Sequence, residues 1–481
     1  MLTRLYIDGV WQDGARGRTM PVHNPANEAV LAHVAVADAD DVERAVDAAA
    51  RAFKTWRHTS GADRGRYLRA VAKAVEAQAE ALARLQSLNN GKPLAEARID
   101  VADVASTFAY YATLAEGLDE SSEQAVDLPV QDFDARVRRE PAGVAALIVP
   151  WNFPMVTTAW KLAPALAAGC TVVLKPSEVT PLPELALMGI IADVGLPAGV
   201  VNVVNGPGAE IGGVLTTHPG VSKVSFTGSN AVGRIVMKAA AETVKGVSLE
   251  LGGKSAILVF EDADIDQAVD LVTGGIFFNA GQMCSATSRL LVARELERAL
   301  LDRLVDRAHR IVVGDPFAQD VQMGPLINRA QYERVLRYVR QGVEDGARLL
   351  AGGARPERCG PQGYYISPTI FTDVPANSAL WREEIFGPVL CVRAFDTEAD
   401  AIELANDSPY GLAATVVTSD TQRARRVAQR LDAGVVWVNA PQVIFPQTSW
   451  GGFKQSSLGR ELGPWGMHAF QEIKSVVSAR G

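Results

Sequence analysis

Apolar residues follow two different patterns along this chain. Across residues 38–116 they are rich in alanine and recur at helical spacing, with Arg and Glu on the opposite faces. From Val144 onward, short uninterrupted apolar runs alternate with helical stretches. Such runs are typical of strands buried on both faces, in a parallel sheet that helices cover. The pattern therefore predicts an α/β protein.

The predicted strands form two sets, and each set predicts one α/β domain. The first set comprises residues 144–149, 171–174, 200–204, 223–226 and 247–249. The second set comprises residues 256–260, 290–292, 389–394, 415–417 and 435–439.

Two further segments fit neither set. Residues 124–139 are polar and alternating, which predicts a hairpin arm, and residues 472–477 are a lone short strand. Strands of this kind can add to the sheet edge of a partner chain, and they can equally pack within their own chain. Both interpretations stay open at this point.

Length and charge narrow the class of protein. A chain of 481 residues is too long for one ordinary core and predicts two or three domains. Hydrophobic residues make up 48% and charged residues 21%, which is typical of a globular protein. The net charge of −8 argues against nucleic acid as the main partner.

One segment raises the question of a membrane span. Residues 155–174 are largely apolar, but Lys161 and Pro164 interrupt them and Gly169 divides them. We therefore expect a buried helix followed by a buried strand, and no membrane association. The first eight residues lack the apolar core of a signal peptide.

The cysteines and histidines suggest neither disulfides nor a metal site. The four cysteines, Cys170, Cys284, Cys359 and Cys391, include no CxxC pair, and four are too few for a disulfide framework. A reducing, cytoplasmic location fits this usage best. The six histidines are scattered without an HExxH motif, so no metal is expected.

Cys284 occupies an unusual setting among these cysteines. It lies among small, polar and glycine residues in the stretch 277–289, after an apolar helical pattern and before a strand-like run. A substrate can reach a thiol in such a place, and a thiolate is a strong nucleophile. Free cysteines are more often inert and buried, so this segment alone leaves both interpretations open.

The ends of the first set of strands carry candidate nucleotide-binding residues, since dinucleotides bind at the carboxyl ends of parallel strands. Lys175 and Glu178 follow the second strand, and the glycine-rich residues 227–233 follow the fourth and open a helix that can cradle a phosphate. The GxGxxG fingerprint is absent after the first strand. A carboxylate at Glu178 can accept hydrogen bonds from a ribose and would repel a 2′-phosphate, although a surface Lys–Glu pair is an equal alternative.

Several strings together resemble the aldehyde dehydrogenase superfamily. They are PWNFP, KLAPALAAGCTVVLKPSE, VSFTGS, LELGGKS, GQMCSATSR, EEIFGPV, PYGLAA and WGGFKQSSLGRELG, in family order across almost the whole chain. The resemblance implies a Rossmann-like cofactor domain, a second α/β catalytic domain and a small β oligomerisation arm. We assign them to residues 1–120 with 141–252, residues 253–440, and residues 121–140 with 461–481, and we expect a homo-oligomer.

The resemblance also implies a mechanism. Cys284 would attack the aldehyde to give a thiohemiacetal, with Asn152 and the Cys284 backbone N–H as the oxyanion hole. Loss of hydride to the nicotinamide would leave a thioester, and Glu250 would activate the water that hydrolyses it. Relatives that form acyl-CoA lack this carboxylate, so its presence favours release of a free acid. Lys161 and Glu461 would form a buried pair, either relaying protons or serving the structure.

The implied cofactor is NAD, favoured over NADP by the carboxylate of Glu178. Residues implied to line its site come from several motifs. They are Ile148, Pro150, Trp151, Lys175, Ser177, Glu178, Gly208, Gly228, Ser229, Val232, Leu251, Gly252, Glu384 and Phe386.

The strings are most similar to the betaine aldehyde and aminoaldehyde branch. Four aromatic residues, Phe153, Trp160, Phe278 and Trp450, match positions that line the substrate channel there, and such rings attract cations. Phe278 replaces the Trp of many plant members, which weakens a ring cage. The same rings would also suit an aliphatic or aromatic aldehyde.

Three further residues bear on the substrate. Asp100 and Asp103, three apart on one helical face, match acids that attract an amine at the channel mouth, although such a pair is usually only a solvated face. Val435 stands where side-chain size affects acceptance of a trimethylammonium head, and its intermediate size puts betaine aldehyde itself in doubt.

The leading hypothesis is NAD-dependent oxidation of betaine aldehyde or an ω-aminoaldehyde such as 4-aminobutyraldehyde to its acid. A dehydrogenase for aliphatic or aromatic aldehydes is the alternative. A non-catalytic structural relative is a remote third possibility, because Cys284, Glu250 and Asn152 are all present.

Overall fold

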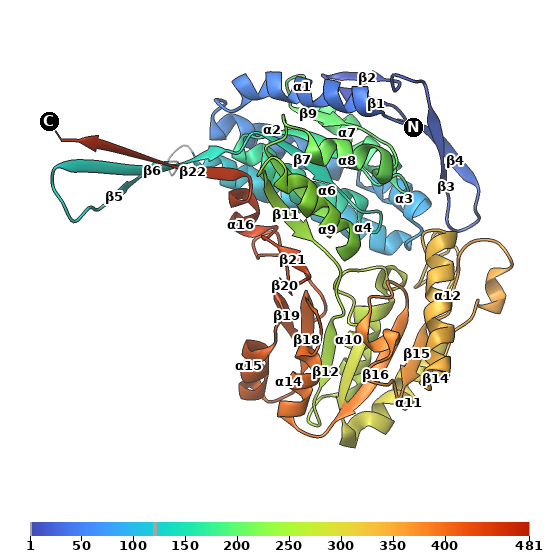
Figure 1. Ribbon diagram of the computed structural model, residues 1–481. Helices are drawn as coiled ribbons and strands as arrows, with labels where there is room; N and C mark the ends of the chain where they lie inside the picture. The colour runs from blue at the N-terminus through green and yellow to red at the C-terminus, as the bar shows by residue number, and fades with distance from the viewer. Residues whose placement is uncertain (1, 119–122, 481) are drawn as a thin grey trace.

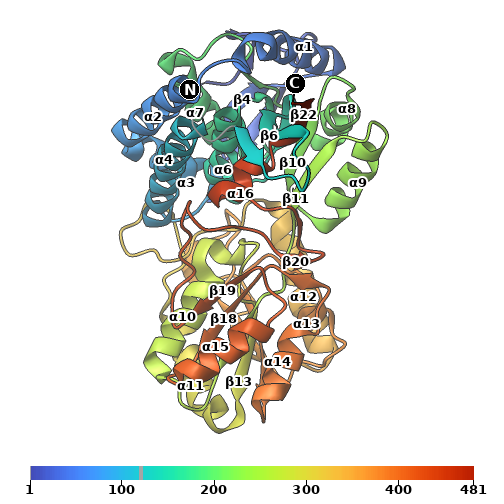
Figure 2. The ribbon, with the colours of Figure 1, turned by 90° about the vertical axis from the view of Figure 1, so that its left-hand side faces the viewer.

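Two open sheets, one above the other in Figure 1, organise the chain, and a narrow arm projects from the upper one. The computed structural model describes residues 2–118 and 123–480. The view turned by 90° in Figure 2 shows the same two bodies, each with helices packed around its sheet.

The upper sheet has the order β2-β1-β9-β8-β7-β10-β11-β21. Its five inner strands are parallel, as their continuous apolar runs predict, and the strands at both edges are antiparallel. The strands are β1 (Leu5–Ile7), β2 (Val10–Gln12), β7 (Val144–Ile148), β8 (Thr171–Lys175), β9 (Val201–Val203), β10 (Lys223–Thr227), β11 (Gly246–Glu250) and β21 (Ser457–Leu458).

Helices cover both faces of this sheet. Along β7, Ala145 and Leu147 pack into the core shared with α2, α4, α6 and α7, whereas Ala146 and Ile148 pack into the core shared with α1, α8 and α9. This alternation follows from the two-residue period of a strand. The helices are α1 (Ala39–Trp56), α2 (Gly61–Ala77), α3 (Ala79–Asn90), α4 (Leu94–Glu116), α6 (Pro154–Ala168), α7 (Pro181–Val194), α8 (Gly213–Thr217) and α9 (Asn230–Ala241), with the π-turn η1 (Gly208–Gly212) before α8.

The lower sheet has the order β14-β15-β16-β13-β12-β18-β19 and is parallel except for β14. The five predicted strands are present, and the prediction missed β14 and β15. The strands are β12 (Ala256–Val259), β13 (Arg289–Ala293), β14 (Arg348–Ala351), β15 (Thr369–Thr372), β16 (Val389–Phe395), β18 (Ala413–Val417) and β19 (Val435–Val438). Its helices are α10 (Ile265–Phe277), α11 (Arg294–Arg310), α12 (Arg329–Glu344), α13 (Ala379–Arg382), α14 (Glu398–Asn406) and α15 (Thr421–Arg430).

The arm is a third, three-stranded antiparallel sheet. It contains β5 (Glu123–Val126), β6 (Phe133–Pro141) and β22 (Gln471–Ala479) in the order β22-β6-β5. The predicted hairpin and the predicted lone strand therefore pair with each other within one chain, from Gln471 opposite Pro141 to Ala479 opposite Phe133. Figure 1 shows the arm standing clear of both sheets.

Small elements complete the fold. They are the hairpin β3 (Thr19–His23) and β4 (Val30–Ala35), the pair β17 (Tyr410–Gly411) and β20 (Phe453–Lys454), the 3₁₀ turns η2 (Phe278–Gly281) and η3 (Glu357–Cys359), and the helix α16 (Gly463–His468). The domain limits of the sequence analysis stay predictions, and the limit at residues 120/121 lies outside the described residues.

The apolar segment at residues 155–174 is a helix followed by a strand, as predicted. Every residue of α6 is buried, and the helix is followed by Gly169, whose φ of 94° is left-handed and favours glycine. β8 then enters the sheet centre. Among the described residues, no helix combines the length and apolar character that crossing a membrane requires.

Candidate active site

The site lies where the strand ends of the upper sheet meet the loops of the lower one. The register places Ile148 beside Lys175 and Phe226, and Thr227 beside Glu250, so the carboxyl ends of β7, β8, β10 and β11 share one edge. β11 leads through residues 251–255 directly into β12 of the lower sheet. The Cys284 loop precedes β13, the neighbour of β12, and so it faces the same junction.

The nucleophile candidate follows a strained turn. α10 ends at Phe277, and η2 then carries Asn279 at φ 49° and Ala280 at φ 53°, both left-handed. A non-glycine residue in this region costs roughly 1–2 kcal/mol. Gly281, at φ 71°, has no room for a side chain because an added Cβ would collide with the carbonyl of Gly387. The turn therefore depends on its surroundings to persist.

Asn152 is tied to this turn from the upper sheet. Its Nδ2 donates a hydrogen bond of 3.0 Å to the carbonyl of Gln282, two residues before Cys284. Its own carbonyl accepts from Nδ2 of Asn279 at 3.0 Å and from Nδ2 of Asn90 at 3.3 Å. An amide nitrogen carries two protons, and only one of those of Asn152 has a partner among the described residues. The other is available to an oxyanion.

Cys284 is a partly exposed residue with a weakly acidic thiol. Burial, together with the nearby carboxyl groups of Glu384 and Glu250, raises the pKa of the Cys284 thiol to about 12. The thiol is therefore protonated at neutral pH and needs a base. The loop approaches closely enough that an added Cβ on Gly253 would lie 2.5 Å from the Cys284 carbonyl.

Glu250, at the end of β11, is the candidate for this base. It is buried, and its Oε2 has no hydrogen-bond partner among the described residues. Burial, and then the nearby carboxyl of Glu461, raise the pKa of Glu250 well above its usual range, while Lys161 opposes the shift. A carboxyl group with a raised pKa is a stronger base once it is ionised.

Lys161 and Glu461 form a buried ion pair beside Glu250, as the resemblance implies. Lys161 on α6 donates to Oε1 of Glu461 and, over 2.6 Å, to Oγ1 of Thr227 at the end of β10. The pair joins residues 300 positions apart.

The predicted adenosine-side residues gather at the ends of β8 and β9. Lys175 is buried, and its Nζ lies 3.3 Å from Oε2 of Glu178. The other oxygen of Glu178 accepts from the N–H of Gly208 at 3.3 Å. Ser177, which lies between Lys175 and Glu178 in the sequence, is also buried, and its Oγ accepts a hydrogen bond from the N–H of Val179.

The predicted pyrophosphate-side residues surround the start of α9. Ser229 caps this helix, with its Oγ accepting from the N–H of Val232 at 3.3 Å. The N–H of Gly228 donates to the Glu250 carbonyl at 3.0 Å, and an added Cβ there would lie 2.5 Å from the Phe226 ring. The N-terminus of a helix beside a glycine, whose backbone no side chain covers, suits the binding of an anionic group.

The predicted nicotinamide-side residues come from both sheets. Glu384 accepts from the N–H of Gly253 at 3.1 Å, and burial raises the pKa of Glu384 to about 7. An added Cβ on Gly252 would collide with the Glu384 carboxylate. Phe386 meets Trp151 edge-on, with ring centroids 5.2 Å apart.

Three more predicted cofactor residues lie along the same edge. Ile148 ends β7, Pro150 follows it, and the Leu251 N–H after β11 donates to the Ser456 carbonyl at 2.8 Å. The structure thus brings the predicted cofactor residues to one edge of the upper sheet.

The four predicted channel aromatics form two pairs. Trp160 and Trp450 lie with ring centroids 5.3 Å apart, and Phe153 and Phe278 are nearly parallel with centroids 6.4 Å apart. Val435 packs against the apolar cluster that contains both tryptophans. These residues come from both sheets and from the C-terminal region, so the fold assembles them.

The two predicted channel acids have separate environments. Asp103 accepts a hydrogen bond of 2.7 Å from Nε1 of Trp160, and burial raises the pKa of Asp103 to about 7. Asp100, by contrast, is buried in an ion pair with Lys92 and accepts from Gln86. The expectation of a matched pair of acids at the channel mouth is therefore wrong for Asp100. Their three-residue spacing puts both on the inner face of α4, where Lys92 already neutralises Asp100.

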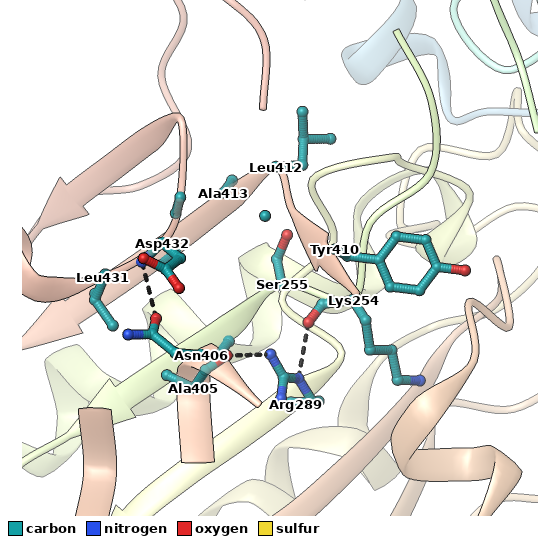
Figure 3. A pocket seen from close by; sticks show the side chains of 14 residues that line it. Lys254, Ser255, Arg289, Ala405, Asn406, Tyr410, Leu412, Ala413, Leu431 and Asp432 are labelled. Carbon is teal, nitrogen blue, oxygen red and sulfur yellow. Dashed lines mark hydrogen bonds between the residues drawn. The ribbon is translucent and has the colours of Figure 1, made fainter. Parts of the chain in front are cut away.

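A small polar cavity lies behind the site and is not part of it. It holds about 20 Å³, enough for about one water molecule, and it is lined by residues including Ser255, Arg289, Asn406 and Asp432 (Figure 3). Arg289 there donates to the carbonyls of Lys254 and Ala405. Arg289 therefore ties the chain between β11 and β12 to the end of α14.

Comparison with known proteins identifies the family. The model of the aldehyde dehydrogenase family matches residues 11–476. The chain belongs to the aldehyde dehydrogenase family. The predicted family and fold are therefore confirmed.

Relatives within the family share almost the whole chain. The peroxisomal aminoaldehyde dehydrogenase 2 of Malus domestica is 46% identical over 98% of this chain and 95% of its own. Betaine aldehyde dehydrogenase 1 of Oryza sativa subsp. japonica is 46% identical over 98% of this chain and 94% of its own. A crystal structure of Staphylococcus aureus betaine aldehyde dehydrogenase in complex with NAD⁺ superposes with a TM-score of 0.97 at 40% identity, covering 99% of this chain and 95% of that one.

Sequence reasoning missed several residues of this aldehyde dehydrogenase site. Glu96, Asn279 and Gln282 hold the Cys284 turn. Asn90, at the end of α3, donates to the Trp151 carbonyl, and Lys92 lies 3.8 Å from the centroid of the Phe153 ring. Glu96 and Asp100 are four residues apart, a spacing that places two acids on one helical face. The spacing of Glu96 and Asp100 could therefore have indicated a shared acidic face, but nothing in the sequence showed that this face of the helix is buried.

Alkylation of Cys284 tests the electrostatic account of this site. With a thiol pKa near 12, the thiolate fraction rises about tenfold for each pH unit below that value. The rate of iodoacetamide alkylation, followed by peptide mass spectrometry on the cofactor-free enzyme, should therefore rise without a plateau from pH 7 to pH 9.5. A plateau below pH 9 would contradict the enclosure of the thiol.

Proposed function

We propose that this aldehyde dehydrogenase oxidises betaine aldehyde or an ω-aminoaldehyde to its free carboxylic acid with NAD and with Cys284 as nucleophile. The observation that carries the proposal is the hydrogen bond from Asn152 to the Gln282 carbonyl, which holds an amide N–H ready beside the Cys284 loop. Cys284, Glu250 and Asn152 keep the roles that the family resemblance implies.

The residues at the edge of the upper sheet fit NAD. Glu178 can accept from the adenosine ribose, Ser229 and Gly228 present a helix N-terminus to the pyrophosphate, and Glu384 can accept from the nicotinamide ribose. The negative charge of Glu178 disfavours a 2′-phosphate, which supports NAD over NADP. When bound, NAD serves as the hydride acceptor of the oxidation.

In the first step that this chain's residues perform, Cys284 becomes a thiolate. The pKa of its thiol is high, so a proton must pass to a neighbouring base, and the raised pKa of the nearby carboxyl of Glu250 suits that role. The sulfur then bonds to the aldehyde carbon, and the carbonyl oxygen gains negative charge. The free N–H of Asn152 and the backbone N–H of Cys284 stabilise that charge.

In the second step Glu250 acts on water. After oxidation the acyl group remains on Cys284 as a thioester. The ionised carboxylate of Glu250 takes a proton from a water molecule, which attacks the thioester carbon and displaces the Cys284 sulfur. The pair Lys161–Glu461 adjusts the basicity of Glu250, because Glu461 raises the pKa of that carboxyl and Lys161 lowers it.

Substitution of Glu250 separates the two steps. Glu250→Gln should lower steady-state kcat by about 10²–10⁴-fold, because it removes the general base. The acyl group should then accumulate on the Cys284 peptide and be visible by mass spectrometry after mixing with aldehyde and NAD. Unaltered steady-state turnover would remove Glu250 from the mechanism.

Two features support a cationic aldehyde. The names of the relatives above include aminoaldehyde and betaine aldehyde dehydrogenases. In this chain, Asp103 places a carboxyl on the nitrogen of Trp160, beside Trp450. A carboxylate next to aromatic faces favours an ammonium group over a neutral chain. The alternative, a dehydrogenase for aliphatic or aromatic aldehydes, needs no such charge.

Asp103→Asn tests the substrate class, because Asn still accepts from Trp160 but carries no charge. It should lower kcat/KM for 4-aminobutyraldehyde about tenfold and leave kcat/KM for hexanal within twofold. The pKa of Asp103 is raised to about 7, so in the parent enzyme the attracting charge is present above pH 7 and is lost as the pH falls. The ratio of kcat/KM for 4-aminobutyraldehyde to kcat/KM for hexanal should therefore decrease as the pH is lowered through 7. A parent enzyme that prefers hexanal at pH 8 contradicts the cationic proposal.

The arm supports a homo-oligomer. β5 and nearly all of β22 are exposed, and they carry apolar residues on the surface, including Val126, Ile473 and Val477. Apolar side chains exposed together on a projecting sheet are typical of an interaction surface, so a second copy of the chain is the proposed cover. We also propose a cytoplasmic location, supported by the four free cysteines. Plant relatives named peroxisomal and chloroplastic give that location no support.

Ile473 and Val477 lie two alternations apart on one face of β22, so charges there should break the oligomer. Analytical ultracentrifugation should give a dimer or larger for the parent enzyme and mainly monomer for Ile473→Glu/Val477→Glu. The matched control is Val343→Glu, an exposed valine on α12. A monomeric parent enzyme would contradict the proposed role of the arm.

A further inference from the structure

A buried carboxyl from the upper domain holds the strained turn before Cys284. Oε2 of Glu96, on α4, accepts a hydrogen bond of 3.0 Å from the backbone N–H of Asn279, which lies 183 residues later in the chain. Asn279 is the first of the two left-handed residues of η2. The contact therefore acts directly on a residue with a left-handed backbone.

Asn279 in turn connects the two parts of the proposed oxyanion site. Its Nδ2 donates to the carbonyl of Asn152 at 3.0 Å and to the carbonyl of Gln282 at 3.2 Å. The same Gln282 carbonyl accepts from Nδ2 of Asn152. A shift of the Asn279 backbone would thus move the oxyanion donor and the segment that carries Cys284 relative to each other.

We infer that Glu96 is a positioning residue for the aldehyde dehydrogenase reaction, which acts through Asn279 on Asn152 and Cys284. This inference rests on the proposed roles of Asn152 and Cys284. Glu96 touches neither residue in any described hydrogen bond, so its effect would be on geometry alone.

The surroundings of Glu96 explain why an acceptor, and not a charge, is required. Glu96 is 8% exposed, and the nearest cation, Lys92, is paired with Asp100. Among the described residues, the Asn279 N–H is the hydrogen-bond partner that Glu96 has. Burial raises the pKa of Glu96 to about 8, so the carboxyl is mostly neutral at pH 7 and still accepts through its oxygen. A glutamine oxygen could take its place.

Three substitutions separate acceptor, reach and charge. Glu96→Gln keeps an acceptor at the same reach, Glu96→Asp keeps the acid but is one methylene too short, and Glu96→Met keeps the volume without an acceptor. Steady-state kinetics should show kcat within about twofold of the parent for Glu96→Gln. For Glu96→Asp and Glu96→Met, kcat should fall at least tenfold while KM for NAD stays within twofold.

The matched control is Thr107→Val. Thr107 is buried on the same helix, and its hydroxyl has no hydrogen-bond partner among the described residues, so kcat should not change. Cys284→Ala is measured in parallel: retained turnover there would overturn the proposed function, whereas an inactive Cys284→Ala leaves the Glu96 comparison valid.

Two results would overturn the positioning role. One is a Glu96→Asp enzyme with the parent kcat, and the other is a Glu96→Gln enzyme as slow as Glu96→Asp. If Glu96→Met fails to fold, the comparison of Gln with Asp still decides the question, because it compares a neutral acceptor at the parent's reach with an acid that is one methylene too short.

Discussion

The hydrogen bond from Asn152 to the Gln282 carbonyl is the constraint on which the rest of the site depends. It joins the loop after β7 of the upper sheet to the loop before β13 of the lower one. Together with the hydrogen bonds from Asn279 to the Asn152 carbonyl and to Glu96, it holds the oxyanion donor and the nucleophile candidate, which belong to different sheets, in one arrangement. A misplacement of about 1 Å at reacting groups can cost about 10²-fold in rate, so this tie has direct chemical value. The left-handed turn at Asn279 and Ala280 is the conformational cost of the arrangement.

Burial of the ionisable side chains is the second constraint on the site, and it affects the thiol and the carboxyl groups in opposite ways. Burial raises the pKa of Cys284, Glu250 and Glu384 alike, which leaves the thiol protonated and makes Glu250 a stronger base when ionised. The dry surroundings also strengthen any hydrogen bond to a developing oxyanion. The buried Lys161–Glu461 pair places both charges beside Glu250, so the site can adjust that carboxyl without exposure to water.

Sequence reasoning succeeded where a local pattern controls the structure. The apolar runs predicted the parallel strands, and the motifs after them predicted which residues gather at the strand ends, from Lys175 to Glu250. It failed where long-range packing decides. β21 joins β11 from more than 200 residues away, and no local pattern shows this. Asp100 resembled a channel acid, but Lys92 neutralises it, and Glu96 gave no sign that its partner would be the backbone of Asn279.

The central claim is that Asn152, held by Gln282, presents its free N–H to the oxygen of an aldehyde at Cys284. A crystal structure of the Cys284→Ala enzyme with NAD and 4-aminobutyraldehyde tests this most directly. The account predicts the aldehyde oxygen within about 3.2 Å of Asn152 Nδ2, with the bond to the Gln282 carbonyl intact and the carbonyl carbon facing residue 284. An aldehyde oxygen bound elsewhere, with the Asn152 amide turned away from Gln282, would contradict it.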